Sequence, residues 1–275
     1  MRMWRIMLAA VLGLGTTTAA VAGASVCGSP AQAAQVRAAA PEVWIAGDST
    51  VANPSSSGAC PVGWGNKIGS YLVDGVAVHN SAVGGRSIQT WMYEGNVTST
   101  IGSNGECVLS AQTYSTRWQA MLDGMGAGDY LLIQFGINDG SATCPRHVGS
   151  ARYQELLRTM AAAAKQRGAT PVFLTPVAAI TCSGSSAVGN RGFLTETRTA
   201  GSAAGATVID LHARSVALYN RLKLCPNNGD YSTGAVGAFF CADHTHFEAA
   251  GAQQIAGLVA AAIREQGIGL AAYLR

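Results

Sequence analysis

The 275-residue sequence has few charged residues and, beyond its first segment, no long hydrophobic run. Only 12% of its residues are charged and 48% are apolar, which excludes a charge-rich disordered chain and favours a compact globular fold. No later stretch is apolar over the length of a transmembrane helix, so we expect no stable membrane association. The sequence also has no internal repeat and no second-domain boundary. We therefore expect one domain with one sizeable core.

The first segment is typical of a secretory signal peptide. Arg2 and Arg5 precede a short apolar run over residues 6–15, and small residues follow. A membrane anchor is the alternative, but Gly and Thr dilute the apolar run and make it too short for a comfortable span.

Cleavage fits after Ala22 or after Ala33, and we assign residues 1–33 to the signal peptide and residues 34–275 to the single domain of a secreted protein. This removes two basic and no acidic residues, so 18 basic against 15 acidic residues becomes 16 against 15. A nearly neutral domain has no excess of basic charge for a phosphate backbone, so we expect no nucleic-acid partner.

The cysteine count becomes even once Cys27 leaves with the signal peptide. An even count in an exported protein predicts disulfide bonds. A zinc site is the alternative, but the sequence contains no C-x-x-C pair. Six cysteines allow fifteen connectivities. Because each sequential pair would close one loop region, we expect the bonds Cys60–Cys107, Cys144–Cys182 and Cys225–Cys241.

Apolar, strand-like segments alternate with helix-like segments along the chain. Strands are predicted at 43–47, 76–83, 130–135, 171–177 and 207–211. Helices are predicted at 64–72, 116–125, 150–167, 193–204, 216–224 and 247–265, and loops at 95–105, 181–190 and 225–240. Ser150 is the expected cap of the helix that it begins. This alternation predicts βαβ units, and hence a parallel sheet with helices on both faces.

The first predicted strand ends abruptly in Gly47-Asp48-Ser49-Thr50. A serine at the carboxyl end of a parallel strand lies where open α/β sheets place their ligands, so Ser49 is a candidate nucleophile. Gly-Asp-Ser is also common in turns and helix caps, which is the alternative. No lipase-type G-x-S-x-G elbow surrounds Ser49.

Asp243 and His246 are the candidates for a base and its orienting carboxylate. The two residues are three positions apart across a tight turn, so their side chains can emerge on the same side. The Asp243 carboxylate can then accept a hydrogen bond from one ring nitrogen of His246 and fix its tautomer. A helix-capping Asp beside a surface His is the alternative. His244 is the rival base, although adjacent side chains diverge.

Three hydrogen-bond donors for an oxyanion are expected just after predicted strands. They are the backbone N–H groups of Ser49 and Gly85 and the side-chain amide of Asn138. A plain glycine turn and an Asx-turn are the alternatives for the last two. Arg86 and Trp91 follow the glycine turn and are candidates to line a sugar-binding site. The alternative for both is a role in loop packing.

Together these segments resemble the SGNH (GDSL-type) hydrolase superfamily, whose four blocks supply Ser, Gly, Asn and His in this order. A narrower resemblance is to the rhamnogalacturonan acetylesterase branch. It rests on Gly-Asp-Ser-Thr-Val (47–51), Gly-Gly-Arg-Ser (84–87), Gln-Phe-Gly-x-Asn-Asp-Gly (134–140) and Asp-x-Thr-His-Phe (243–247). Two features depart from that branch: Ile137 stands where a His is usual, and the run after Val177 lacks an expected Arg.

The resemblance implies a three-layer α/β/α sandwich with a parallel, flavodoxin-like sheet and no metal or other cofactor. It implies Ser49 as nucleophile, His246 as base and Asp243 as its orienter, with Gly85 and Asn138 in the oxyanion hole. The implied activity is that of a secreted serine esterase that removes acetyl groups from plant cell-wall polysaccharide. A broad-specificity lipase or esterase and a non-catalytic carbohydrate-binding protein are the alternatives. We expect a monomer that binds acetylated polysaccharide or a small ester.

Overall fold

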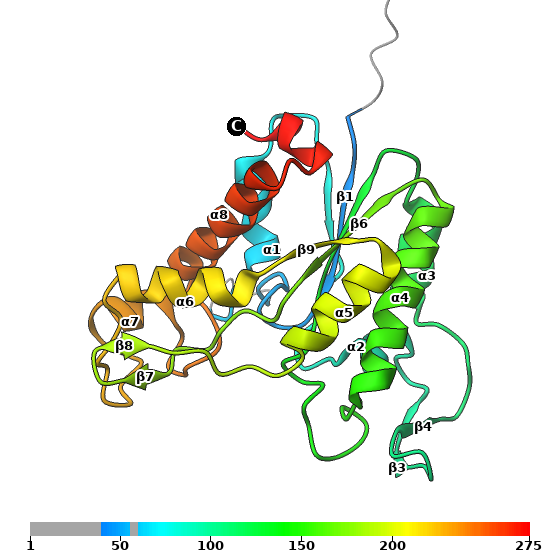
Figure 1. Cartoon of the computed structure of the whole chain (residues 1–275), viewed down its shortest axis with the longest axis horizontal. Helices are drawn as coiled ribbons and strands as arrows, with labels where there is room; N and C mark the ends of the chain where they lie inside the picture. The colour runs from blue at the N-terminus through cyan, green and yellow to red at the C-terminus, as the bar shows by residue number, and fades with distance from the viewer. Residues whose placement is uncertain (1–39, 56–59) are drawn as a thin grey trace, which may run out of the picture. The chain divides into compact units, whose positions relative to one another are not determined.

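The computed structural model describes residues 40–55 and 60–275, so the predicted signal peptide lies outside the described residues. Five parallel strands form the central sheet (Figure 1). In spatial order they are β2 (Val78–Asn80), β1 (Val43–Gly47), β5 (Tyr130–Gln134), β6 (Thr170–Leu174) and β9 (Thr207–Ile209). The strand order reverses at β1, with β2 on one side and β5 on the other. Open α/β sheets bind their ligands outside the carboxyl ends of the strands at such a point.

Strand β1 is buried on both faces of the sheet. Val43 and Ile45 belong to one hydrophobic core, and Trp44 and Ala46 belong to the other. Because successive side chains of a strand point to opposite faces, a strand covered on both sides is apolar at every position. This explains why the sequence shows a continuous apolar run before Asp48.

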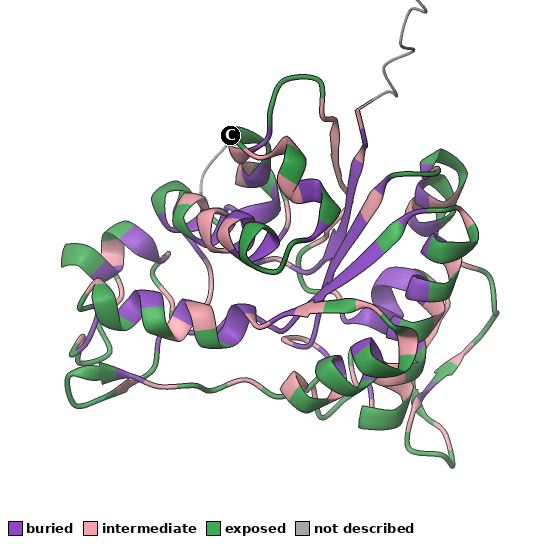
Figure 2. Cartoon of the chain, turned by 45° about the horizontal axis from the view of Figure 1, so that its top comes forward, coloured by how far each residue is buried: buried purple, intermediate pink, exposed green. Residues whose placement is uncertain are grey.

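Helices cover both faces of this sheet, and Figure 2 shows buried strands between helices whose outer sides are exposed. One core lies under α1 (Trp64–Lys67), η1 (Ile68–Tyr71), α6 (Leu211–Arg221), α7 (Gly234–Phe239), α8 (Ala249–Glu265) and η2 (Gly269–Tyr273). The other lies under α2 (Ile88–Met92), α3 (Thr116–Gly124), α4 (Ser150–Gln166) and α5 (Leu194–Ala204). The predicted three-layer α/β/α sandwich with a flavodoxin-like parallel sheet is thus confirmed. Within residues 40–55 and 60–275, no helix has both the length and the apolar character needed to cross a membrane.

Three segments expected to be loops contain short elements. They hold strand β3 (Val97–Ile101), the hairpin β7 (Cys182–Ser183) and β8 (Ser186–Ala187), and helix α7, and β3 pairs with β4 (Cys107–Leu109) just beyond its loop. The strands of the two hairpins have two to five residues and do not join the central sheet, so no sustained apolar alternation marks them in the sequence.

Two helix starts also differ from the prediction. Helix α6 begins earlier than expected, because the Asp210 side chain caps it by accepting a hydrogen bond from Ala213 N–H at 3.1 Å. Ser150 does not cap α4. Gly149 is its N-cap residue, and the Ser150 hydroxyl instead donates a hydrogen bond to Glu196 at 2.7 Å.

The six cysteines among the described residues all form disulfide bonds, but the predicted sequential pairing is wrong. The bonds are Cys60–Cys241, Cys107–Cys144 and Cys182–Cys225. Cys60 follows β1 and Cys241 precedes α8, so the longest connection joins two segments that meet only in the folded chain. The pairing depends on which segments are neighbours in space, and sequence order does not give this.

Candidate active site

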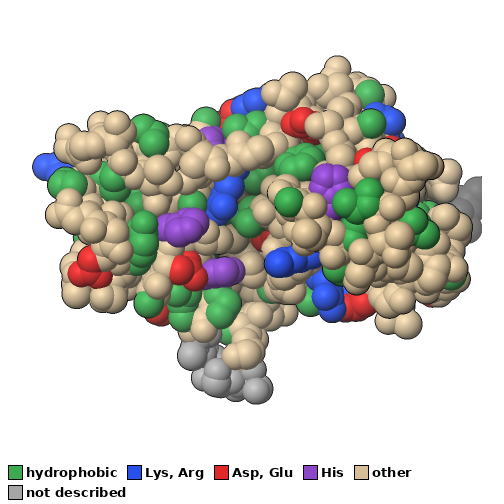
Figure 3. All heavy atoms as spheres, turned by 90° about the horizontal axis from the view of Figure 1, so that it is seen from below, with side chains coloured by type: hydrophobic (Ala, Val, Ile, Leu, Met, Phe, Trp, Pro, Cys, Tyr) green, Lys and Arg blue, Asp and Glu red, His purple; other side chains and the backbone are tan. Residues whose placement is uncertain are grey.

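Ser49, His246 and Asp243 lie in a continuous hydrogen-bonded chain at the carboxyl ends of the strands. Ser49 Oγ is 2.9 Å from His246 Nε2, and His246 Nδ1 is 2.8 Å from Asp243 Oδ2. Figure 3 views this edge of the sheet and shows histidine and acidic side chains side by side, with basic side chains near them. His244, the rival base, contacts the Thr245 hydroxyl through Nδ1 at 3.1 Å and not Ser49.

The turn that carries His246 is folded around Asp243. Asp243 Oδ1 accepts hydrogen bonds from the backbone N–H groups of Thr245 at 2.7 Å and His246 at 2.8 Å. This leaves Asp243 Oδ2 for the imidazole ring of His246. Partial burial raises the pKa of Asp243, but the hydrogen bonds from His246 and Thr245 outweigh it, so the net pKa is lowered. The carboxylate is therefore ionised and able to stabilise an imidazolium.

The turn that carries Ser49 is held by buried polar contacts. Asp48 Oδ1 accepts hydrogen bonds from the N–H of Thr50 at 2.9 Å and from its hydroxyl at 2.8 Å. The Thr50 hydroxyl in turn accepts a hydrogen bond from Gln134, at the end of β5, at 2.7 Å. A Cβ on Gly47 would lie 2.8 Å from the Gln134 carbonyl oxygen, so glycine is needed where β1 passes β5. The sequence did not reveal these supporting roles of Asp48 and Thr50.

The three predicted oxyanion donors have N–H groups without an acceptor. Among the described residues, the backbone N–H groups of Ser49 and Gly85 donate no hydrogen bond. The Asn138 amide donates one of its two hydrogens to the Arg86 carbonyl at 3.0 Å, and the other has no acceptor in the described chain. The glycine turn lies against the serine, since a Cβ on Gly84 would lie 3.6 Å from the Ser49 Cβ.

Asp139 connects the loop after β5 with the start of α2. Its Oδ1 accepts a hydrogen bond from Ile88 N–H and its Oδ2 one from Gly136 N–H, both at 2.8 Å. The side chain is fully buried, and burial raises its pKa to about 7. These contacts fix the loop that carries Asn138.

Arg191 is a residue of this region that the sequence did not predict. Its Nε donates a hydrogen bond to the Val177 carbonyl at 3.2 Å, and one Nη donates to the Thr245 hydroxyl at 3.1 Å. Its charge interacts with the carboxyl groups of Asp48 and Asp243. Arg191 comes from beyond the β7–β8 hairpin and contacts the Val177 carbonyl, and no local pattern in the sequence marks it.

Trp91 does not have the position that sugar binding would need. Trp91 is 0% exposed, packs against Trp118, and donates a hydrogen bond from Nε1 to the Ser81 carbonyl at 2.9 Å. Its ring therefore cannot stack on a sugar, and that prediction is wrong. Arg86 forms an ion pair with Glu94 through one guanidinium nitrogen and is partly exposed, so its role at a sugar site stays a prediction.

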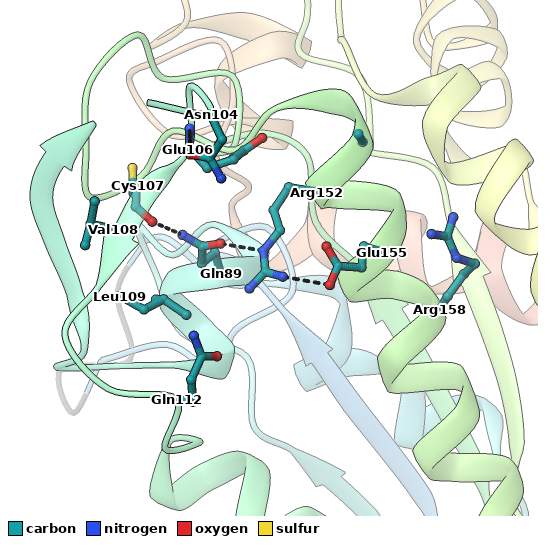
Figure 4. Close-up of a pocket in the computed structure, with 11 residues that line it drawn as sticks. Gln89, Asn104, Glu106, Cys107, Val108, Leu109, Gln112, Arg152, Glu155 and Arg158 are labelled. Atoms are coloured by element: carbon teal, nitrogen blue, oxygen red, sulfur yellow. Dashed lines mark hydrogen bonds and ion pairs between the residues drawn. The ribbon is translucent and has the colours of Figure 1, made fainter. Parts of the chain in front are cut away.

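A cavity of about 740 Å³ contains none of the predicted catalytic residues in its wall. It lies between the β3–β4 hairpin and α4 (Figure 4). Within it Arg152 is held between Gln89 and Glu155, with hydrogen bonds of 2.9 Å to each. A cavity of about 370 Å³ instead includes Asn138, one of the predicted oxyanion donors, in its wall.

The model of the GDSL-like lipase/acylhydrolase family matches residues 45–254, which run from β1 into α8 and include all the residues of the hydrogen-bonded chain. The chain belongs to this family. It is accordingly a carboxylic ester hydrolase.

Relatives of this GDSL-like protein include acetylesterases of Bacillus subtilis (strain 168). One named a rhamnogalacturonan acetylesterase is 30% identical over 85% of this chain and 94% of its own length. Another, named a probable rhamnogalacturonan acetylesterase, is 29% identical over 83% of this chain and 94% of its own. The crystal structure of the YxiM protein from Bacillus subtilis has a TM-score of 0.65 at 25% identity, and the match covers 83% of this chain and 57% of that one. The relatives confirm the resemblance that the four sequence blocks indicated.

Proposed function

We propose that this protein is a secreted serine acetylesterase that removes acetyl groups from pectic polysaccharide of the plant cell wall. The observation that carries the proposal is the Ser49–His246–Asp243 chain, with contacts of 2.9 and 2.8 Å. The names of two relatives support the substrate class. Three disulfide bonds support an oxidising compartment outside the cytoplasm.

In the proposed first half-reaction, His246 Nε2 takes the proton of Ser49 Oγ as that oxygen attacks the acetyl carbonyl carbon. Asp243 keeps the other ring nitrogen protonated and stabilises the imidazolium. The tetrahedral oxyanion accepts hydrogen bonds from the N–H groups of Ser49 and Gly85 and from the Asn138 amide. When the intermediate collapses, the sugar oxygen leaves with the proton from His246, and the acetyl group stays on Ser49.

In the second half-reaction a water molecule attacks the acetyl-serine ester. His246 takes the proton of this water, and the same three donors hold the second oxyanion. Collapse returns the proton to Ser49 Oγ and releases acetate. One base therefore serves both steps, so its orientation by Asp243 matters twice.

Acetate release from acetylated pectin, acetylated xylan and a small aryl acetate tests the proposal, with wild type and Ser49→Ala side by side. We expect release from pectin by the wild type, and a loss on the order of 10⁴-fold or more in a variant that keeps its thermal unfolding temperature. A folded wild type that is inert on all three would contradict the proposal. So would full activity of Ser49→Ala.

The family description also covers lipases, so a broad-specificity lipase or esterase is the second candidate. Aryl esters of increasing acyl length separate the two. A fall in kcat/KM beyond acetyl supports the acetylesterase, whereas a strong preference for long chains would favour the lipase.

A further inference from the structure

The cavity of about 370 Å³ beside Asn138 has two arginines in its wall. Arg146 comes from the loop after β5, and Arg191 comes from the segment before α5. Among the described residues that line the cavity, none is acidic. Its volume lies at the small end of the roughly 300–1,000 Å³ of ligand-binding cavities, a size that suits one sugar ring.

Arg146 has a charge without a partner in the described chain. It is exposed, and no ion pair or hydrogen bond joins its side chain to another described residue. The Cys107–Cys144 disulfide anchors its loop just before it. A guanidinium is a planar fork of N–H donors that matches the two oxygens of a carboxylate. Arg146 is therefore available to an acidic ligand.

Arg191 places this cavity next to the proposed reaction centre. A guanidinium has five N–H donors, and two of them are used, on the Val177 carbonyl and the Thr245 hydroxyl. The other three have no acceptor among the described residues and can donate to a ligand. Thr245 lies between Asp243 and His246 in the chain, so a group bound by Arg191 lies near the turn that carries the proposed base.

Part of the cavity wall is apolar, which favours a sugar over a simple anion as the ligand. Ile137 and Phe193 line the same cavity, and the Phe193 ring packs against Tyr153 with centroids 4.6 Å apart. Phe193 has a φ of 60°, a left-handed conformation that aromatic residues rarely adopt, so the surrounding structure holds it in place. The carbon face of a sugar ring can pack on such a wall, whereas an inorganic anion gains nothing from it.

We propose that this cavity binds a uronate residue of the polysaccharide, whose carboxylate is bound by Arg146 and Arg191. The proposal rests on the proposed function and deepens it. The uronate subsite adjoins the acetyl site, so it determines which acetylated polymers reach Ser49. Ile137, which stands where the rhamnogalacturonan acetylesterase branch usually has a His, then lines the substrate cavity itself.

Arg146→Gln tests the subsite, because the side chain is exposed and its loss leaves no buried group unpaired. Arg158→Gln is the matched control, since Arg158 is also exposed, has no ion pair with a described residue, and lines the larger cavity of Figure 4. Both are compared with wild type on acetylated oligouronide, on the same material with its carboxyl groups reduced to alcohols, and on an aryl acetate. We expect KM for the oligouronide to rise about tenfold in Arg146→Gln alone, with unchanged kinetics on the other two substrates.

A wild type that hydrolyses the aryl acetate but shows no preference for uronate overturns the subsite and leaves the esterase proposal standing. An equal rise of KM on the carboxyl-reduced substrate overturns it as well. Binding of deacetylated oligouronide, measured by calorimetry, tests the subsite without turnover. Salt-sensitive binding to wild type that weakens in Arg146→Gln but not in Arg158→Gln supports it, and equal binding to all three overturns it.

Discussion

At the scale of single residues, Asp243 uses its two carboxylate oxygens for different tasks. Oδ1 holds the backbone of the turn, and Oδ2 holds the ring of His246. In Asp243→Asn the amide oxygen can keep the backbone contacts, which turns the amide NH₂ toward His246 Nδ1. A donor at that position favours a proton on Nε2, where the base must accept one from Ser49. We expect kcat to fall on the order of 10³–10⁴-fold with little change in KM.

The control for this variant is Asp230→Asn. Asp230 Oδ1 also accepts a backbone hydrogen bond, from Ser232 at 2.8 Å, in an exposed turn. Steady-state kinetics on an aryl acetate and thermal unfolding of both variants give the comparison. An equal loss of activity in Asp230→Asn, or none in Asp243→Asn, would count against the orienting role of Asp243.

Asp139 makes folding stability depend on pH. Its pKa is about 7 in the folded protein because the side chain is buried, against an ordinary value of 3.8. The folded state therefore keeps a proton that the unfolded state loses between about pH 4 and 7. The contribution of Asp139 to stability is fully present below about pH 4 and is lost as the pH rises through about 7, with a slope of up to roughly 1.4 kcal/mol per pH unit.

Asp139→Asn removes this titration. We expect the free energy of unfolding, measured with denaturant at intervals from pH 4 to 8, to fall less steeply with pH in the variant than in wild type. Parallel curves for the two proteins would show that Asp139 does not titrate in this range.

The sequence predicted candidate site residues that stand in a recognisable local block, and it missed residues whose contacts form only in the folded chain. Ser49 and Asn138 stand in recognisable blocks directly after strands. Arg191 contacts Val177 and Thr245, which come from segments far from it along the chain. Trp91 was misassigned for the same reason, because its burial is a property of the packed core.

At the scale of elements, the sequence predicted the strands whose apolar pattern follows from their burial. Strands β1 and β5 are apolar because helices cover both of their faces. Helix α2 was not predicted, since it has five residues and its start is set by a reciprocal cap. The Ser87 side chain accepts a hydrogen bond from Thr90 N–H, and the Ser87 N–H donates to the Thr90 hydroxyl at 2.8 Å. Such a cap is a weak signal without a long apolar face behind it.

The turn after β2 allows a matched pair of variants. Gly85 has a φ of 73°, so Gly85→Ala strains the backbone by roughly 1–2 kcal/mol and shifts the N–H that we assign to the oxyanion. A Cβ on Gly84 would meet the Ser49 Cβ at 3.6 Å, an ordinary contact. We expect Gly85→Ala to lose both stability and kcat, and Gly84→Ala to keep its stability. Denaturant unfolding and aryl acetate kinetics measure both, and a stable, fully active Gly85→Ala would contradict the assignment.

At the scale of the whole molecule, one disulfide bond connects the two segments that the proposed catalytic arrangement needs together. Cys60–Cys241 joins the segment after β1 to the turn that carries His246, and it spans 181 residues. Val62 N–H also donates a hydrogen bond to the Phe247 carbonyl at 2.9 Å, so the two segments run side by side. Ser49 and His246 are thus held in register by a covalent bond as well as by packing.

Removing this bond should therefore affect catalysis as well as stability. In the chain-entropy model a cross-link across 181 residues contributes roughly 5 kcal/mol, and Cys182–Cys225, across 43 residues, roughly 4 kcal/mol. We expect both double serine variants to unfold at lower temperature. At a temperature where both variants remain folded, kcat should fall about ten- to a hundredfold only in the variant that lacks Cys60–Cys241. Without that bond the proposed base His246 loses its fixed distance to Ser49. Equal kcat in the two variants would mean that packing alone positions His246.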